Sequence, residues 1–263
     1  MRHIGMSVAL AAIILPATAS AQSVFDGRWR VDLGSTELPK KPWVVTLNDR
    51  NFRCASCGTP WGIPADGGFH KVAGQNYFDE AAVKRIDPRT IEFHYRKGGR
   101  LVETDRISIS ADGKTFTSVD TDHATPNGEL AVYRSTARRS ADGARGAHPL
   151  DGSWVTTSYD KGSDNTMTVT MRMEGDRFSF ADGTGSHYTA TLGGPPVKVE
   201  GDLAGRMIAA KRLSPNALQL DASIGGKADS RMIVTVAPDG KKMNVEATNL
   251  KQAVTTRFVA YKQ

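Results

Sequence analysis

The chain contains an internal repeat, and this repeat limits the fold more than any other feature of the sequence. Asp26-Gly27 and Trp29 recur as Asp151-Gly152 and Trp154, at an offset of 125 residues. Further along, the offset becomes 127 and holds, matching Lys71-Val72 to Lys198-Val199, Lys84-Arg85 to Lys211-Arg212, and Asp112-Gly113-Lys114 to Asp239-Gly240-Lys241. A shared offset among ordinary turn residues indicates a duplication, so the fold must be one that roughly 110–120 residues can build twice.

The hydrophobic pattern predicts β-strands in both copies. Apolar and polar residues alternate in Met167-Thr-Val-Thr-Met-Arg-Met173, which is the period of a half-buried strand. Similar stretches occur at 28–33, 43–48, 81–86, 90–96, 100–110, 115–121 and 130–137, separated by turn residues such as Asn48-Asp49 and Gly98-Gly99. Helical periodicity is nearly absent, so we expect an all-β protein built as an antiparallel sandwich or barrel.

The repeat also predicts the domain organisation. We expect a first module at residues 22–138 and a second at 150–263, each opening on a Gly-x-Trp strand. Residues 139–149 are rich in small residues and contain Gly and Pro, which is typical of a linker between modules.

Residues 1–21 are typical of a secretory signal peptide. A basic start at Arg2 precedes an uncharged stretch at 4–15, and Ala19 and Ala21 form a small-x-small cleavage site. The stretch is shorter than the about 20 residues of a membrane span, and no later segment approaches that length. We therefore predict cleavage after Ala21 and a periplasmic or secreted protein; a buried or interfacial N-terminal helix is the alternative.

Charge and motifs exclude several classes of function. The net charge is +6 with both signs interspersed, whereas a nucleic-acid binder concentrates its basic residues on one stripe, so no nucleic-acid partner is expected. The histidines after the signal peptide are scattered and form no metal-binding pair, and phosphate-binding loops, dinucleotide fingerprints and nucleophile elbows are absent from the sequence. We predict no metal and no cofactor, and infer no oligomeric state.

With its length, strand pattern and Gly-x-Trp motif, each module resembles the lipocalin-like, or calycin, superfamily. The resemblance implies two tandem antiparallel lipocalin-like β-barrels, in which Trp29 and Trp154 plug the closed ends and Arg134 and Arg257 cover the plugs. The run Phe52-Arg-Cys-Ala-Ser-Cys57, with Ala65-Asp-Gly67 and Ser110-Ala-Asp-Gly-Lys-Thr115, is also similar to secreted bacterial proteins with lipocalin-like repeats, a group that implies no particular reaction.

Cys54 and Cys57 are the only cysteines and belong to the first module alone. In an oxidising compartment such a pair is expected to form a disulfide. A thioredoxin-like redox site and a metal site are the alternatives, although the first needs a helix N-terminus and the second needs four ligands. Gly58 follows Cys57 where haem attachment would need His. We expect a disulfide that fixes the shape of a loop.

Aromatic residues gather in the first module. They are either core residues or the lining of a cavity, because small-molecule pockets are mostly apolar. As candidate ligand contacts we name Trp43, Trp61, Phe69, Tyr77 and Tyr95. Trp61, in the Gly- and Pro-rich segment 58–68, is the first choice as a ligand contact or lid.

These observations lead to three functional hypotheses. The first is a non-enzymatic, exported binder of a small, partly apolar ligand in a barrel cavity. The second is a calycin-type enzyme, similar to isomerases or hydratases, with Asp122 and His123 as general acid or base at the mouth of the first module. The third is an envelope module that binds other proteins.

Overall fold

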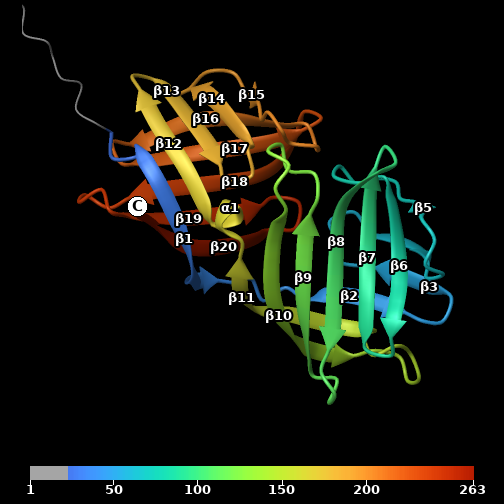
Figure 1. Ribbon diagram of the computed structural model, residues 1–263. Helices are drawn as coiled ribbons and strands as arrows, with labels where there is room; N and C mark the ends of the chain where they lie inside the picture. The colour runs from blue at the N-terminus through green and yellow to red at the C-terminus, as the bar shows by residue number, and fades with distance from the viewer. Residues whose placement is uncertain (1–22) are drawn as a thin grey trace, which may run out of the picture.

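The computed structural model describes residues 23–263 and confirms the all-β class. It contains two nearly closed, antiparallel, ten-stranded sheets that resemble barrels (Figure 1). The first barrel has the strand order β4 (Trp61–Pro64), β3 (Asn51–Cys54), β2 (Trp43–Leu47), β11 (Gly152–Gly162), β10 (Ala131–Asp142), β9 (Thr115–Asp122), β8 (Arg100–Ile109), β7 (Thr90–Lys97), β6 (Glu80–Asp87) and β5 (His70–Lys71).

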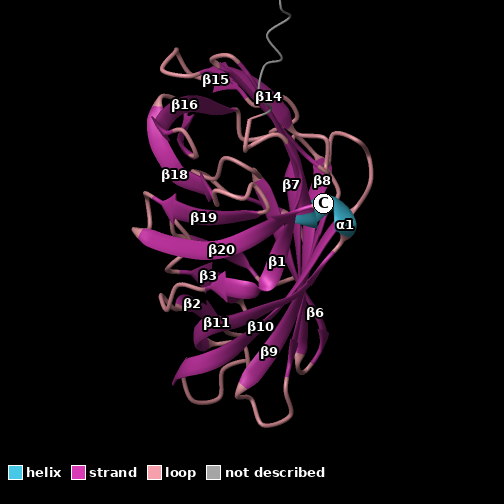
Figure 2. Cartoon of the chain, turned by 90° about the vertical axis from the view of Figure 1, so that its left-hand side faces the viewer, coloured by secondary structure: helices cyan, strands magenta, loops and turns pink. Residues whose placement is uncertain are grey.

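The second barrel repeats this order with its own strands. It consists of β14 (His187–Thr191), β13 (Arg177–Asp182), β12 (Thr168–Glu174), β1 (Gly27–Glu37), β20 (Val254–Lys262), β19 (Lys242–Asn249), β18 (Lys227–Val236), β17 (Ala217–Ile224), β16 (Arg206–Ser214) and β15 (Val197–Lys198). Within the described residues, one short helix, α1 (Asp164–Met167), interrupts the strands (Figure 2). No helix of residues 23–263 is long and apolar enough to cross a membrane. The predicted signal peptide lies outside the described residues.

The two modules exchange their first strands. β1, from the start of the chain, pairs with β12 and β20 of the second barrel. β11, which opens the second copy, pairs with β10 and β2 of the first barrel. In Figure 1 the blue β1 accordingly lies among the yellow to red strands of the second barrel. Each sheet therefore contains, as its fourth strand, a strand from the other half of the sequence.

This exchange corrects the predicted division into contiguous modules 22–138 and 150–263. The predicted linker, 139–149, does not connect the two barrels. β10 continues to Asp142, and the remaining residues form the turn that leads into β11 of the same barrel. The chain crosses between barrels at two other places, 38–42 and 163–167, which follow the exchanged strands. The first crossing contains Pro39 and Pro42, a breaker signal that the expected module boundaries did not use.

The Asp-Gly-x-Trp motif has the same role in both barrels. Gly27 and Gly152 have φ values of +127° and +126°, which a residue with a Cβ rarely adopts. The preceding aspartates accept hydrogen bonds from the other module: Met173 N donates to Asp26 at 2.7 Å, and Leu47 N donates to Asp151 at 2.9 Å. The motif thus fixes the exchanged strand at the point where it enters the foreign barrel.

Both tryptophans are fully buried plugs, as the resemblance implies, although each plugs the barrel of the other module. Trp29 donates a hydrogen bond from Nε1 to Phe25 O at 2.9 Å, and Trp154 donates to Leu150 O at 2.8 Å. Trp29 belongs to the core of the second barrel and Trp154 to that of the first. Burial of such a ring excludes a large apolar area from water.

The covering cations differ from the predicted Arg134 and Arg257. The Arg139 guanidinium lies 4.1 Å from the Trp154 ring centroid, and Lys262 Nζ lies 5.0 Å from that of Trp29. Strand register explains the difference, because Arg139 is the residue paired with Trp154 and Lys262 the one paired with Trp29. Arg134 is exposed, and Arg257 is bound to Glu246 at 2.8 Å on the surface.

Candidate functional site: the interiors of the two barrels

The aromatic residues of the first barrel pack against one another. Trp61 is buried, and its ring centroid lies 5.1 Å from Phe52, 5.6 Å from Phe78 and 6.2 Å from Tyr95. It starts strand β4 and belongs to the first core, which does not fit the predicted role as a lid. The segment is rich in Gly and Pro, but Trp61 and Ile63 alternate inward and complete the core.

The other candidate ligand contacts are dispersed. Trp43 packs on Phe116 at 6.0 Å in the first core. The Phe69 ring lies under the Arg96 guanidinium at 3.6 Å. Tyr77 lines a small pocket between the barrels, of about 210 Å³. The structure therefore brings Trp61 and Tyr95 together but does not gather the five predicted residues around one cavity.

The first barrel contains a cluster of partly buried carboxyl groups that the sequence pattern did not indicate. Ser118 Oγ donates to Asp105 at 2.6 Å and lies 3.0 Å from Asp120, on paired strands β8 and β9. Burial, followed by the charges of Asp120 and Asp122, raises the pKa of Glu103 to about 7. Burial, followed by the Asp120 charge, also raises the pKa of Asp105 well above its usual range. Among residues 23–263 no group of three or more acidic, His or Cys side chains could hold a metal ion.

Asp122 and His123, the candidate acid–base residues, point in different directions. Asp122 lines the small pocket between the barrels and accepts a hydrogen bond from Ala124 N at 2.7 Å. His123 Nε2 lies 3.0 Å from Thr104 Oγ1. Adjacent residues of an extended chain face opposite sides, which accounts for the separation. The two side chains therefore form no pair around a common substrate.

A cavity of about 490 Å³ lies in the second barrel. Apolar side chains from β13, β16, β17 and β18 form much of its wall, among them Phe180, Ile208, Leu220 and Met232, and Val199 adds to it directly after β15. Polar groups from Tyr188, Ser230, Thr248 and Asn249 are placed among them. This combination is typical of small-molecule sites, whose volumes are about 300–1,000 Å³.

Comparison of the paired strands explains why the second barrel is hollow and the first is not. In the first barrel Tyr95 pairs with Glu103, and at the equivalent position of the second barrel Ala222 pairs with Ser230. The neighbouring strand pairs keep this same correspondence between the two barrels. At four interior positions away from the plugs, the first barrel has large or charged residues where the second has smaller or uncharged ones. Tyr95, Glu103, Asp105 and Asp120 correspond to Ala222, Ser230, Met232 and Ala247, and all four of the latter line the cavity.

Tyr188, on β14, is the most distinctive residue of the cavity. Its ring stacks on Phe180 at 5.3 Å and only 7% of the residue is exposed. Its hydroxyl makes no hydrogen bond to any residue of the 23–263 segment, and burial raises its pKa above the usual value. The hydroxyl is thus a protonated donor facing the cavity. Tyr188 was not among the residues expected from the sequence. Comparing the sizes of side chains that lie 127 residues apart would, however, have indicated that the second barrel contains a cavity.

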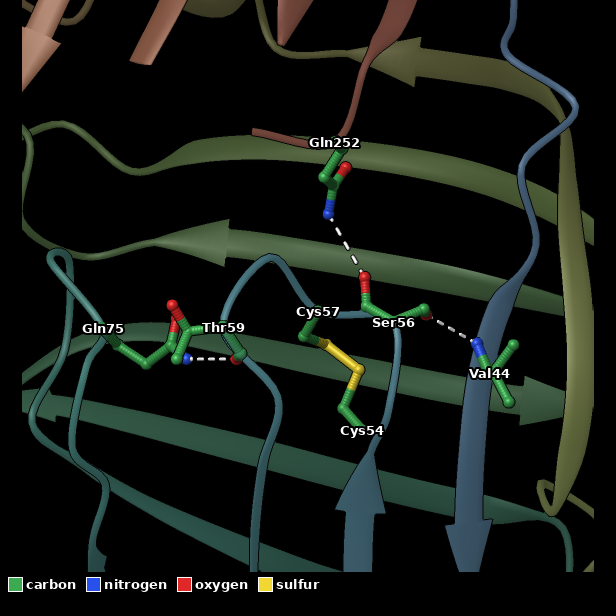
Figure 3. The surroundings of a disulfide bond; sticks show 7 residues. All are labelled: Val44, Cys54, Ser56, Cys57, Thr59, Gln75 and Gln252. Atoms are coloured by element: carbon green, nitrogen blue, oxygen red, sulfur yellow. Dashed lines mark hydrogen bonds between the residues drawn. A yellow bond between two sulfur atoms is a disulfide. The ribbon is translucent and has the colours of Figure 1, made fainter. Parts of the chain in front are cut away.

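The predicted disulfide between Cys54 and Cys57 is present, and its loop contacts the second barrel (Figure 3). Ser56, between the cysteines, accepts a hydrogen bond from Val44 N on its hydroxyl at 2.7 Å. Its carbonyl accepts one from Gln252, in the β19–β20 turn, at 3.3 Å. The disulfide therefore shapes a loop that supports the contact between the barrels.

A second contact joins the barrels near the cavity. Asn127, in the β9–β10 turn, donates to Thr184 O at 3.2 Å and to Gly183 O at 3.0 Å. Pro126 fits over Gly201, whose φ of +85° suits glycine and where a Cβ would lie 2.2 Å from Pro126 Cγ. The same region of the second barrel, at Asp202, also lines the cavity.

Comparison with known proteins adds no further assignment: the chain matches no protein-family model, and no curated protein matches it significantly.

Proposed function

We propose that the protein is an exported, non-enzymatic binder of a small, partly apolar ligand, held in the cavity of the second barrel. The observation that carries this proposal is the cavity of about 490 Å³, lined mostly by apolar side chains and containing the hydroxyl of Tyr188. Barrels of this size can enclose one small ligand. The proposed site is therefore not the aromatic cluster of the first module.

The lipocalin-like resemblance and the predicted export belong to the same proposal. Two nearly closed barrels, each with a buried tryptophan from a Gly-x-Trp strand, are compatible with the resemblance. A disulfide between Cys54 and Cys57 is compatible with an oxidising compartment, periplasmic or extracellular. The catalytic alternative receives less support, because Asp122 and His123 do not face a common space.

The test compares binding of N-phenyl-1-naphthylamine, an uncharged fluorescent probe, to the wild type and to a variant with a filled cavity. Ala222→Tyr introduces the residue that the first barrel has at the equivalent position and occupies part of the cavity. We expect saturable binding by the wild type and at least a tenfold loss in Ala222→Tyr. Ala228→Tyr, an exposed site on β18, is the matched control and should bind like the wild type. Equal binding by all three proteins would refute the proposed site.

A further inference from the structure

The two arginines of the cavity form ion pairs within the protein, although the buried Nε of Arg206 makes no hydrogen bond with the described residues. Arg206 Nη1 lies 3.3 Å from Asp202, and its Nε lies 3.9 Å from Asp229. Arg231 is bound to Asp221 at 2.6 Å. Asp229 is further bound to Lys251 at 3.0 Å. The arginines that line the cavity thus face carboxylates of their own chain.

A charged ligand would meet unfavourable neighbours in this arrangement. Two arginines and two aspartates line the cavity, so its wall has no excess of either sign. An anion would have to compete with Asp202 for Arg206 while giving up its own hydration, and a cation would meet the same arginines. An uncharged ligand avoids both costs.

Tyr188 differs from these arginines, because its hydroxyl has no hydrogen-bond partner among the described residues. The residue is 93% buried, its hydroxyl makes no hydrogen bond within the described part of the chain, and it opens onto the cavity and is not enclosed by protein. A hydroxyl in such a position is free to bond to water or to a ligand in the cavity. Phe180 and Phe178, at 5.3 and 6.2 Å from the Tyr188 ring, fix its direction.

We propose that the ligand is an uncharged molecule with a largely apolar body and a carbonyl or ether oxygen that accepts a hydrogen bond from Tyr188. This inference rests on the proposed function and narrows it to one ligand chemistry. Tyr188 acts as a positioning group for the oxygen, and the apolar wall contributed by Leu220 and Ile208 takes the body of the molecule.

Three probes of nearly equal shape test this chemistry. They are 2-acetylnaphthalene, with a carbonyl acceptor; 2-isopropenylnaphthalene, with a methylene in place of the oxygen; and 2-naphthoate, with a carboxylate. Dissociation constants are measured by titration calorimetry on the wild type, Tyr188→Phe, and the control Tyr261→Phe, whose tyrosine is exposed. Removal of the Tyr188 hydroxyl keeps the ring that packs on Phe180, so the variant should fold.

We expect the wild type to bind the ketone about 3- to 10-fold more tightly than the alkene, which corresponds to one hydrogen bond, and the carboxylate most weakly. Tyr188→Phe should bind ketone and alkene equally, while Tyr261→Phe should match the wild type. Tightest binding of the carboxylate, or a ketone affinity unaffected by Tyr188→Phe, would overturn this inference and leave the proposed site standing. If Ala222→Tyr weakens binding of none of the three probes, or none binds, the proposed function itself fails.

Discussion

At the scale of single residues, the contrast between Tyr188 and Glu103 separates the two interiors. Tyr188 is a neutral donor in a hollow barrel. Glu103 belongs to a barrel whose interior is occupied by carboxyl groups, where burial raises its pKa to about 7. A buried carboxyl with a raised pKa favours the protonated, uncharged form. The folded first barrel therefore holds protons that the unfolded chain releases.

This proton uptake predicts a pH dependence of stability. The unfolded Glu103 titrates near its usual value of 4.5 and the folded one near 7. The stabilising protonation is complete below about pH 4.5 and is lost as the pH rises to about 7, so the free energy of unfolding should fall over this window. Glu103→Gln should reduce this decrease in the free energy of unfolding by about 1–3 kcal/mol. The measurement is urea unfolding between pH 4.5 and 8.

The matched control is Glu129→Gln, at an exposed position. It should keep the wild-type slope, because Glu129 lies in the exposed β9–β10 turn, outside the carboxyl cluster of Glu103, Asp105 and Asp120. A wild-type stability that rises between pH 4.5 and 7, or a slope unchanged by Glu103→Gln, would contradict the raised pKa.

Residue identity predicted some of these features and not others. The disulfide follows from two cysteines in one short segment, and the buried tryptophans follow from the Gly-x-Trp motif. Arg139 was missed because its position over Trp154 depends on cross-strand register, which the motif does not specify. Tyr188 was missed because one tyrosine in an alternating strand carries no local sign that its hydroxyl lacks a partner.

At the scale of elements, the exchanged strands β1 and β11 couple the two halves of the chain. Local pattern predicted β1, since 28–33 lies within it, and the Gly-x-Trp motif predicted that a strand opens the second copy at β11. The local pattern could not predict which barrel each strand enters, because both strands carry Asp-Gly-x-Trp and either could fit either barrel. The barrel that each strand enters is decided by pairing over long sequence distances.

Paired cysteines test the exchange directly. Arg30 lies opposite Tyr261 on neighbouring strands, a separation that a disulfide can bridge. Arg138, paired with Val155, is the equivalent of Tyr261 in the first barrel. We expect Arg30→Cys with Tyr261→Cys to cross-link in oxidised protein, as seen by mass spectrometry of peptides.

The matched pair is Arg30→Cys with Arg138→Cys, which would cross-link only if β1 closed its own module. We expect this pair to remain reduced. Cross-linking of the second pair in place of the first would show that each barrel is closed by its own strand.

At the scale of the whole molecule, the two barrels share a frame and differ in their contents. Both have the plug, the covering cation and the strand order. The first is filled by aromatic and carboxyl groups and provides the disulfide loop and the β9–β10 turn that contact the second. The second keeps a cavity. We infer that the first barrel supports the second, which is the binding unit.

The candidate ligand contacts expected from the sequence lie in the first module, and the structure packs its aromatic residues together for a physical reason. A crowd of aromatic residues fits a filled core as well as a lined cavity, and Trp61, Phe52 and Tyr95 here fill the space. Cavities arise from missing bulk, and at Ala222 the sequence shows this only when it is aligned with Tyr95 in register.

Ligand binding by the second barrel is tested most directly by mass spectrometry of organic extracts of the protein purified from its native cells. The wild type and Ala222→Tyr are purified in parallel and extracted in the same way. We expect one uncharged, largely apolar compound in near-stoichiometric amount from the wild type, and at least a tenfold smaller amount from Ala222→Tyr. The same compound in equal amounts from both proteins, or a clean extract from the wild type, would contradict a ligand site in this barrel.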